Sequence, residues 1–556
     1  MIKMKGKKML ATLLATIVVA GAIFVSGAKN NGSIKINESE KITVDRATIT
    51  ANKELCTELK TLEKKIIPLP LADIPVTAGE TDESHPAIAS DGVGNIWLAF
   101  EGDLRQTGEY NVWFTYGTEG GATWAENAVA WNIESPPERP SLDYWGGTRF
   151  FGTMVPSPYD ADGGALYLLS CEDPTNFDTY TAVYWTVNDL GAGYYGFVDV
   201  DIACDNALEN WAYGGISMLG EHGRGGERLT KTPMFSYQCT EAGVAWFYYF
   251  SSADDPFKIE NGQSTAFDID PVTHLAYPVW NYLNAETGVL DIFFYIFDFG
   301  KWDEYQGYPI HPDVGGGFIN TTGINDMNID ISAYNNNIII VSQTDEYGSQ
   351  DITCYYSTDG LQTVNKVMIA NTGDNEMYPR VMHIGENSAI CIFVKNGNLY
   401  YTQTEDGGAT WSQPTKINDV DGSVAEEYDT ADMCKAGAIW MDNRNGNYDL
   451  FFDTVGAFPI VGIQSISGGF GAKVTIANIG NAPAKNVAWS IDLEGGLVLL
   501  GKHKEGTISE IQPGTSTTVS TGLVLGIGKV NIKARAGEAS ATASGFVLGP
   551  FVLGVS

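Results

Sequence analysis

Two stretches of this chain are nearly identical: GTEGGATW at residues 117–124 and TEDGGATW at residues 404–411. A degenerate third copy, STDGLQTV, occupies residues 357–364. Each copy ends 13 positions after the Asn or Asp that opens the preceding apolar stretch, namely Asn111, Asp351 and Asn398. The same two-strand unit therefore recurs with a fixed internal spacing.

The distance between repeats indicates the architecture. The openings at residues 351, 398 and 449 are 47 and 51 positions apart. A period near 50 residues with several strands per repeat is typical of propeller blades. Intervening runs such as 96–100 and 338–341 are rich in β-branched and aromatic residues. We therefore predict an all-β fold with a six- or seven-bladed β-propeller over residues 80–458.

The blade number depends on where the inner strands begin. Seven positions are candidates for these starts: His85, Thr148, Thr232, Ser264, Met327, Tyr378 and Tyr428. Residues 186–228 fit the repeat badly and are interpreted as an insertion. A propeller of six blades therefore remains the alternative to one of seven.

The eight-residue motif resembles the Asp-box, S-x-D-x-G-x-T-W, also called the BNR repeat of sialidases. The resemblance implies a sialidase-like propeller, and it specifies fold better than activity. Physically, the short acid can accept hydrogen bonds from its own turn, the glycines permit positive φ, and the aromatic residue packs beneath. We assign a structural role to seven motif residues: Glu119, Gly121, Trp124, Asp359, Asp406, Gly408 and Trp411.

The composition changes after residue 458. Charged residues thin out, and short runs of Val, Ile, Gly and Thr alternate with turn residues. Residues 459–556 are predicted to form a small immunoglobulin-like β-sandwich. The segment VTIANIGNAPAKNV at residues 474–487 resembles the CARDB-type adhesion domains of bacterial and archaeal surface proteins.

The N-terminus carries an export signal. Four lysines precede an uncharged stretch, Met9–Val25, and small residues follow at Ser26–Ala28. This pattern is typical of a secretory signal peptide over residues 1–28, and an uncleaved anchor is the alternative. Residues 29–79 are interpreted as a leader, and no second apolar span long enough for a membrane follows. We expect a secreted or cell-surface protein.

Charge and cysteine content restrict the partners. The formal net charge is -35, which disfavours nucleic acid and anionic membranes. Seven cysteines do not make a disulfide framework, and no CxxC or HExxH motif occurs. No metal site or cofactor is predicted. Bound Ca²⁺ would agree with the acidic charge, but no specific motif supports it. Surface glycans or proteins are the partners we expect.

The sialidase resemblance implies a specific set of catalytic residues. Three arginines hold the substrate carboxylate, a Tyr activated by Glu is the nucleophile, and an Asp is the acid/base. The first arginine belongs to an Arg-Ile-Pro motif, and Ser84 stands at its position here. Arg149 and Arg380 lie near expected inner-strand starts and could face the central channel. The simpler interpretation is that Arg149 and Arg380 are ordinary strand arginines, each in an ion pair or exposed to solvent.

Loops opposite the Asp-boxes supply further candidates. Trp440, Asp442 and Arg444 lie in or beside one such polar loop. They are interpreted either as part of a face that binds glycans or cations, or as ordinary turn residues.

Two functions follow from these observations. The first is a non-catalytic module that binds glycans or proteins, and the alternative is an exo-glycosidase of the sialidase type acting on sialic-acid-like sugars. A purely structural role in the cell envelope is a third. Because Ser84 replaces one arginine, we predict no hydrolysis of sialosides. Convergence of Arg149, Arg380 and Arg444 beside a Tyr–Glu pair would oppose that prediction.

Overall fold

The computed structural model describes residues 58–61 and 73–555, apart from 93, 131–136, 147–148, 157–164, 187–192, 206–213, 225–226, 240–243, 250–262, 285, 299–301, 304–307, 310–312, 320–322, 457–458, 460, 479, 481 and 538. Regular structure in these residues is almost entirely β-strand, with two 3₁₀ turns, η1 (Glu119–Gly121) and η2 (Phe177–Thr179). The predicted all-β fold is confirmed. The proposed signal segment, residues 1–28, lies outside the described residues. Within the described residues, no helix is long and apolar enough to cross a membrane.

Seven antiparallel sheets follow one another along residues 74–453. Their inner strands are β3 (Glu83–Ser90), β8 (Pro137–Gly146), β12 (Gly193–Ala203), β16 (Thr265–Ile269), β22 (Asp326–Tyr334), β26 (Glu376–Gly385) and β30 (Ala431–Cys434). The remaining strands of the first four sheets are β4 (Ile96–Gly102), β5 (Asn111–Thr118), β6 (Thr123–Trp124), β7 (Asn127–Ala130) and β1 (Glu58–Thr61); β9 (Arg149–Pro156), β10 (Ala165–Cys171) and β11 (Tyr180–Thr186); β13 (Gly214–Arg224), β14 (Glu227–Cys239) and β15 (Val244–Tyr249); β17 (Leu275–Leu283), β18 (Leu290–Asp298) and β21 (Asp313–Ile319). Those of the last three are β23 (Asn337–Thr344), β24 (Asp351–Ser357) and β25 (Asn365–Ala370); β27 (Ser388–Lys395), β28 (Asn398–Thr404) and β29 (Thr415–Lys416); β31 (Gly437–Asp442), β32 (Asp449–Asp453) and β2 (Ile74–Pro75). A separate hairpin joins β19 (Trp302–Asp303) to β20 (Tyr308–Pro309).

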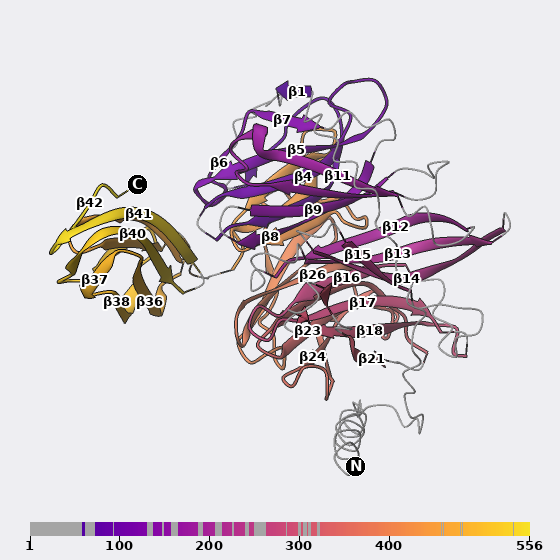
Figure 1. The fold of residues 1–556 in the computed structure, drawn as a ribbon. Helices are drawn as coiled ribbons and strands as arrows, with labels where there is room; N and C mark the ends of the chain where they lie inside the picture. The colour runs from indigo at the N-terminus through magenta and orange to yellow at the C-terminus, as the bar shows by residue number, and fades with distance from the viewer. Residues whose placement is uncertain are drawn as a thin grey trace, which may run out of the picture.

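The sheets form a closed ring. Each inner strand contacts the inner strands of both neighbouring sheets, and β3 meets β8 on one side and β30 on the other. This is the arrangement of blades in a β-propeller, as predicted (Figure 1). The ring closes through β2, in which Ile74 and Pro75 pair with Phe452 and Phe451 of β32. Residues interpreted as a leader therefore supply the outer strand of blade 7.

The third blade differs from its sequence interpretation. Thr232 belongs to β14, the third strand of that blade, and does not begin an inner strand. Residues 186–228 are not an insertion, because they contain β12 and β13, the first two strands of the blade. Thr148 lies outside the described residues, and the second inner strand, β8, ends before it at Gly146. The motif occurs in blades 1, 5 and 6 and is missing from blades 2 and 3, so it could not set the phase of their strands.

Five inner strands carry an aspartate that accepts a hydrogen bond from the backbone of the next blade. The pairs are Asp143 with Cys204, Asp201 with Phe267, Asp268 with Ala333, Asp330 with Val381, and Asp432 with Ile88, at 2.6–2.8 Å. We call these five carboxyls the aspartate ring. They border the enclosed channel, and the surrounding protein raises their pKa, to about 7 for Asp143, about 8 for Asp268 and about 6 for Asp432.

Two of the motif turns are stabilised by their own aspartate. The Asp406 carboxylate accepts hydrogen bonds from Thr410 N–H at 2.8 Å and Thr410 Oγ1–H at 2.7 Å. Asp359 accepts from the same two groups of Thr363, both at 2.8 Å. Burial raises the pKa of both carboxyls, but these hydrogen bonds outweigh it and hold the pKa below the usual value. The motif aspartates therefore hold the turns together.

The glycines of the motif allow each turn to pack on the preceding blade. A Cβ atom at Gly121 would lie 2.2 Å from the Phe452 ring of blade 7, and one at Gly408 would lie 2.9 Å from Tyr356 Cβ of blade 5. Trp124 also packs edge-on against Phe452, with ring centroids 5.4 Å apart. The motif turns thus join neighbouring blades as well as neighbouring strands.

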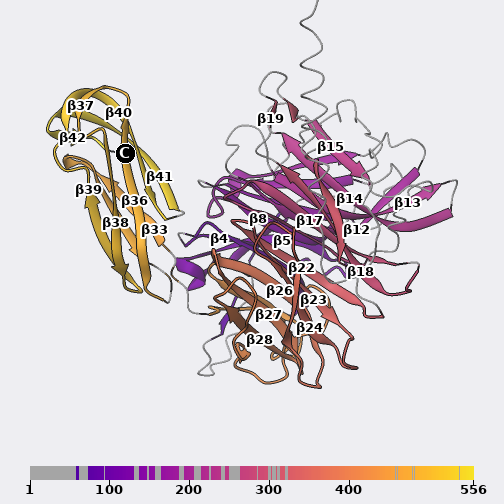
Figure 2. The ribbon, with the colours of Figure 1, turned by 90° about the horizontal axis from the view of Figure 1, so that it is seen from below.

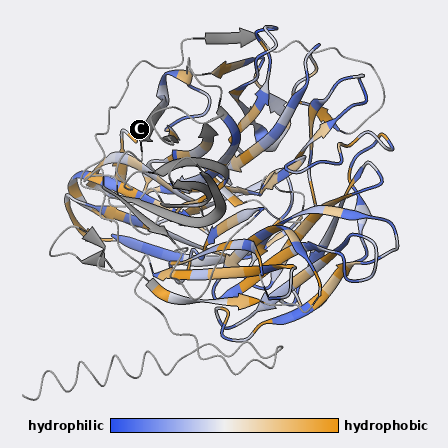
Figure 3. Cartoon of the chain, turned by 90° about the vertical axis from the view of Figure 1, so that its right-hand side faces the viewer, coloured by the Kyte–Doolittle hydropathy of each residue, from blue (hydrophilic) through white to orange (hydrophobic). Residues whose placement is uncertain are grey.

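Residues 461–553 form a second, two-sheet body beside the propeller (Figures 1 and 2). One sheet contains β33 (Val461–Ser467), β35 (Lys473–Asn478) and β39 (Thr515–Ser520), and the other contains β34 (Gly469–Phe470), β36 (Ala484–Glu494), β37 (Leu497–Leu500), β38 (His503–Ile511), β40 (Leu525–Ala536), β41 (Ala539–Gly549) and β42 (Phe551–Leu553). Val474, Ile491 and Ile532 are among the residues of its own hydrophobic core. Hydrophobic residues follow the strands of the molecule, whereas many connecting loops are hydrophilic (Figure 3).

Candidate functional site

A cavity of about 900 Å³ runs along the centre of the propeller and is lined by residues of all seven inner strands. His85, Arg139 and Tyr428 line the end at which the inner strands begin. The chain leaves the propeller at Asp453, at the opposite end, because β32 runs parallel to β30. Sandwich residues such as Asn486 also line the cavity. The end that carries Tyr428 is therefore the one away from the linker.

The backbone is strained where the inner strands begin. Five residues there have positive φ although none is glycine: His85, Arg139, Asn328, Tyr378 and Asp429, at 46–58°. In four of these blades a register shift in the first strand pair accompanies the strained residue. Positive φ is costly for side chains with a Cβ, and such strain concentrates at functional sites. Five such residues gather at this end of the channel.

Tyr428 lies between two arginines at this end. The guanidinium carbon of Arg139 lies 5.4 Å from the centroid of the Tyr428 ring, and that of Arg380 lies 5.7 Å from it. Arg380 also forms an ion pair with Asp429. Guanidinium groups at these distances are attracted by the ring electrons and hold the ring in place.

A buried carboxylate lies beneath the tyrosine. Tyr428 Oη donates a hydrogen bond to Asp199 Oδ2 at 3.0 Å, and Thr265 N–H donates to the same oxygen at 2.9 Å. Burial raises the pKa of Asp199, and the charge of Asp429 adds to the effect. Burial also holds the pKa of Tyr428 well above its ordinary range, despite the nearby Arg380 and Arg139. Tyr428 is therefore a neutral phenol at rest.

His85 extends the cluster along the rim. Its Nδ1 lies 3.1 Å from Glu101 Oε2, and Glu101 Oε1 accepts the Arg139 backbone N–H at 2.6 Å. Burial lowers the pKa of His85, but Glu101 outweighs burial, so that this pKa is raised. We refer to His85, Glu101, Arg139, Asp199, Arg380 and Tyr428 together as the Tyr428 site.

Positive and negative groups of the site differ in their exposure. The side chains of Arg139, His85 and Arg380 are 35%, 27% and 20% exposed. The carboxylates of Glu101 and Asp199 are only 9% and 4% exposed, and that of Asp429, the ion-pair partner of Arg380, is 16% exposed. Each cationic side chain is therefore more exposed than the carboxylate that it pairs with, on a protein with a net charge of -35.

No known protein-family model matches the chain, and no curated protein sequence matches it. Solved structures resemble it at low identity. They include the Hadza microbial sialidase Hz136 (10% identity, 66% of this chain and 65% of that chain, TM-score 0.35) and an ulvan lyase of polysaccharide lyase family PL25 (12%, 69% and 94%, 0.40). An α-L-arabinanase of Penicillium chrysogenum is similar to the same extent (10%, 63% and 99%, 0.38). Likenesses this weak carry no functional conclusion for this chain.

Arg149 does not belong to the Tyr428 site. It begins β9, the second strand of blade 2, directly across the turn from Gly146 at the far end of β8. Its guanidinium carbon lies 5.3 Å from the centroid of the Trp145 ring. The sequence interpretation placed an inner strand after residue 148, and this one-strand error moved Arg149 to the wrong end of the channel.

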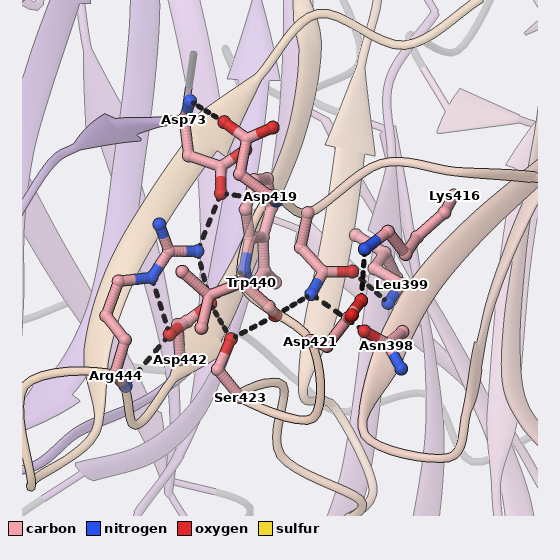
Figure 4. A network of polar contacts seen from close by, with 12 residues as sticks. Asp73, Asn398, Leu399, Lys416, Asp419, Asp421, Ser423, Trp440, Asp442 and Arg444 are labelled. Atoms are coloured by element: carbon pink, nitrogen blue, oxygen red, sulfur yellow. Dashed lines mark hydrogen bonds and ion pairs between the residues drawn. The ribbon is translucent and has the colours of Figure 1, made fainter. Parts of the chain in front are cut away.

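Arg444, Asp442 and Trp440 form a buried network at the closure of the ring (Figure 4). Arg444 Nη2 lies 2.6 Å from both Asp442 Oδ2 and Asp73 Oδ2. Trp440 Nε1 donates to Asp442 Oδ2 at 3.0 Å, and the Arg444 side chain is 6% exposed. These residues join the segment that precedes β2 to blade 7 and offer almost no surface to a ligand.

Sequence reasoning found Arg380 but missed Arg139, Asp199 and Tyr428. Arg139 lies in the segment Pro-Glu-Arg-Pro, which reads as a loop, and Tyr428 is one of 27 tyrosines. Asp199 lies in the stretch interpreted as an insertion. One signal was present, because an Asp followed by an apolar residue occurs in five inner strands, including Asp201-Ile202 of blade 3. Among the described residues, no group of three or more His, Cys, Asp or Glu could hold a metal ion.

Proposed function

We propose that this chain is a secreted or cell-surface β-propeller that binds acidic saccharides at the Tyr428 site without cleaving them. The observation that carries the proposal is that the side chains of Arg139, Arg380 and His85 are each more exposed than the carboxylate that pairs with them. A planar carboxylate on a sugar would accept paired hydrogen bonds from the guanidinium groups. The choice of a saccharide rests on the resemblance of residues 404–411 to the sialidase Asp-box.

Long-range charge opposes the approach of such a ligand. The net charge of -35 repels anions at distances beyond the rim of the channel. Binding must therefore depend on short-range contacts with the two arginines, which only an anion of matching shape can form. This reasoning favours a selective site over general anion binding.

Calorimetric titration with two matched oligosaccharides tests the proposal. One is a sialyl trisaccharide, and the other is the neutral disaccharide that lacks the sialic acid. We expect binding of the first only, and a glycan array that includes uronic acids would extend the comparison. Arg139→Ala and Arg380→Ala should each weaken binding by about 30- to 1,000-fold, the equivalent of ~2–4 kcal/mol. Arg149→Ala removes an exposed arginine from the other end of the channel and should have no effect.

Equal binding of the charged and neutral sugars would contradict the proposal. Unchanged affinity in both the Arg139→Ala and Arg380→Ala variants would also contradict it, because the ligand would then bind elsewhere.

A hydrolase of the sialidase type is the second candidate, and the Tyr428–Asp199 hydrogen bond favours it. Asp199 could accept the phenol proton while the arginines stabilise the phenolate, which would attack the anomeric carbon and break its bond to the aglycone oxygen. The aglycone would leave as an alcohol after taking a proton from water. Water would then cleave the glycosyl–oxygen bond to Tyr428, and Asp199 would return the proton to the phenolate. Against this mechanism, Tyr428 has a raised pKa and only two arginines flank it. We expect no turnover of a fluorogenic sialoside. Turnover that Tyr428→Phe abolishes would establish the hydrolase instead.

A further inference from the structure

One end of the C-terminal sandwich exposes a large apolar surface. Eleven Leu, Ile and Phe side chains there are 40–77% exposed: Phe470, Leu497, Leu499, Leu500, Leu523, Leu525, Ile527, Phe546, Leu548, Phe551 and Leu553. We call them the apolar tip. They come from β34, β37, β40, β41 and β42 and from the segments beside them.

The strand register shows that the tip is continuous. Leu497 faces Ile527, Ile527 faces Leu548, and Leu548 faces Phe551 across successive strand pairs. Phe470 faces Phe551 at the end of this row. Residues that face one another across a sheet are in contact, so the row is one surface and not a scatter of separate side chains.

The core of the sandwich does not require these residues. Along β40 the side chains of Val530, Ile532 and Ala534 are buried, whereas Leu525 and Ile527 lie on the outer face. Further along the same outer face stand Lys533 and other polar residues. Outer faces of sandwiches are normally polar throughout. Taking roughly 200 Å² for each large side chain, about half exposed, the tip presents on the order of 1,000 Å², more than a typical monomer shows.

We propose that the apolar tip binds a second copy of this chain. The area agrees with the roughly 800 Å² that each partner buries in a standard protein interface. Charge agrees as well, because residues 459–556 contain seven Lys and Arg against five Asp and Glu. The sandwich therefore has a net charge of +2, and the rest of the chain carries -37. Two copies can approach through their sandwiches with little repulsion.

The edge of the sheet supports a symmetric contact. Among the described strands, β37 pairs only with β40, so its other edge is open at the tip. An exposed apolar edge strand readily pairs with another strand. Two identical edges related by a two-fold axis can pair antiparallel, which buries both tips in one self-complementary interface. A lipid surface fits less well, because the exposed side chains of the tip include no Trp or Tyr, which membrane interfaces favour.

Sedimentation velocity of the full chain over a range of concentrations tests the proposal. We expect wild-type protein to have twice the mass of one chain. Leu548→Asp places a charge at the centre of the row and should raise the dissociation constant at least ~100-fold. Leu499→Asp alters the most exposed side chain of the tip and gives the same test with less risk to folding.

The matched control is Thr542→Asp, on the outer face of β41 outside the tip. It adds the same charge to the same strand and should remain dimeric. A wild-type chain that is monomeric at ~100 μM would overturn the proposal, as would a Leu548→Asp variant that dimerises as tightly as wild type. Monomers that bind phosphatidylcholine vesicles through Leu548 would overturn it in favour of a lipid surface.

Discussion

At the scale of single residues, two arginines of this chain look similar in sequence and differ in their surroundings. Arg380 keeps part of its side chain in solvent beside Tyr428, whereas Arg444 is enclosed by Asp73 and Asp442. The first can contact a ligand, and the second compensates buried negative charge. Solvent exposure therefore distinguishes Arg380, a candidate binding residue, from Arg444, a structural one. Residue type and position in the sequence do not distinguish them.

This difference predicts the effect of Arg444→Ala. Removal of the guanidinium leaves two buried carboxylates without their cation, which should lower the free energy of unfolding by about 3–5 kcal/mol. Urea unfolding measures the loss, and saccharide affinity of the folded variant should equal that of wild type. Arg149→Ala should change stability by less than about 0.5 kcal/mol. A weaker saccharide affinity in folded Arg444→Ala would show that the closure network acts on the Tyr428 site.

At the scale of elements, the motif turns are expected to differ in strength. Asp406 accepts two hydrogen bonds from Thr410, whereas Glu119 has one long contact, 3.4 Å, with Thr123 Oγ1. Asp406→Ala should therefore cost about 1–2 kcal/mol of stability, and Glu119→Ala about 0.5 kcal/mol or less. Thermal unfolding of the two variants under one condition gives the comparison. Equal losses would mean that the longer Glu side chain holds its turn as well as Asp does.

The sequence predicted those elements whose local chemistry repeats. Motif spacing located blades 1, 5 and 6, because their turns need glycine at positive φ and an acid at fixed positions. The period near 50 residues extended the repeat to blade 7. Blade 3 was missed because it carries no copy of the motif, and strand alternation alone does not say which strand of a blade is innermost. The Tyr428 site was mostly missed for a related reason. Its residues come from blades 1, 2, 3, 6 and 7, and only ring closure brings them together.

At the scale of the whole molecule, the aspartate ring should make stability depend on pH. A carboxyl with a raised pKa binds more protons in the folded than in the unfolded state, so its contribution is complete below pH 4 and is lost as pH rises through the folded pKa. The unfolded pKa is 3.8 and the folded pKa values are about 6 for Asp432, about 7 for Asp143 and about 8 for Asp268, so that loss falls between about pH 4 and pH 8. His383 acts in the opposite direction, with a pKa lowered to about 4 by burial.

We therefore expect the melting temperature to be higher at pH 5.5 than at pH 8.5, with the five aspartates outweighing one histidine. Scanning calorimetry across this range measures the slope. Asp268→Asn keeps an oxygen for the Ala333 amide but cannot ionise, so its slope should be smaller than that of wild type. A melting temperature that rises steadily with pH would show that the ring carboxylates are ionised without cost in the folded protein.

The two bodies of the chain should unfold separately. The hydrophobic core around Val474 and Ile532 belongs to the sandwich alone. A chain truncated after residue 458 should therefore stay soluble and keep the cooperative melt of the propeller. It should also be monomeric, because the apolar tip is gone. Loss of the cooperative transition in the truncated chain would show that the propeller depends on the sandwich.

The closure of the ring through β2 also determines when the propeller can finish folding. Thr77 Oγ1 accepts a hydrogen bond from Leu450 N–H, across 373 residues of chain. During synthesis the N-terminal segment emerges first, and its partner strand emerges only after nearly all of the propeller has been made. The ring stays open while the blades are being made. It closes in the last step, when β2, one of the first strands to be made, pairs with β32, the last strand of the propeller. Long-range pairing of this kind is slow, so a chaperone that shields the segment around β2 until β32 has been made would speed the maturation of this protein.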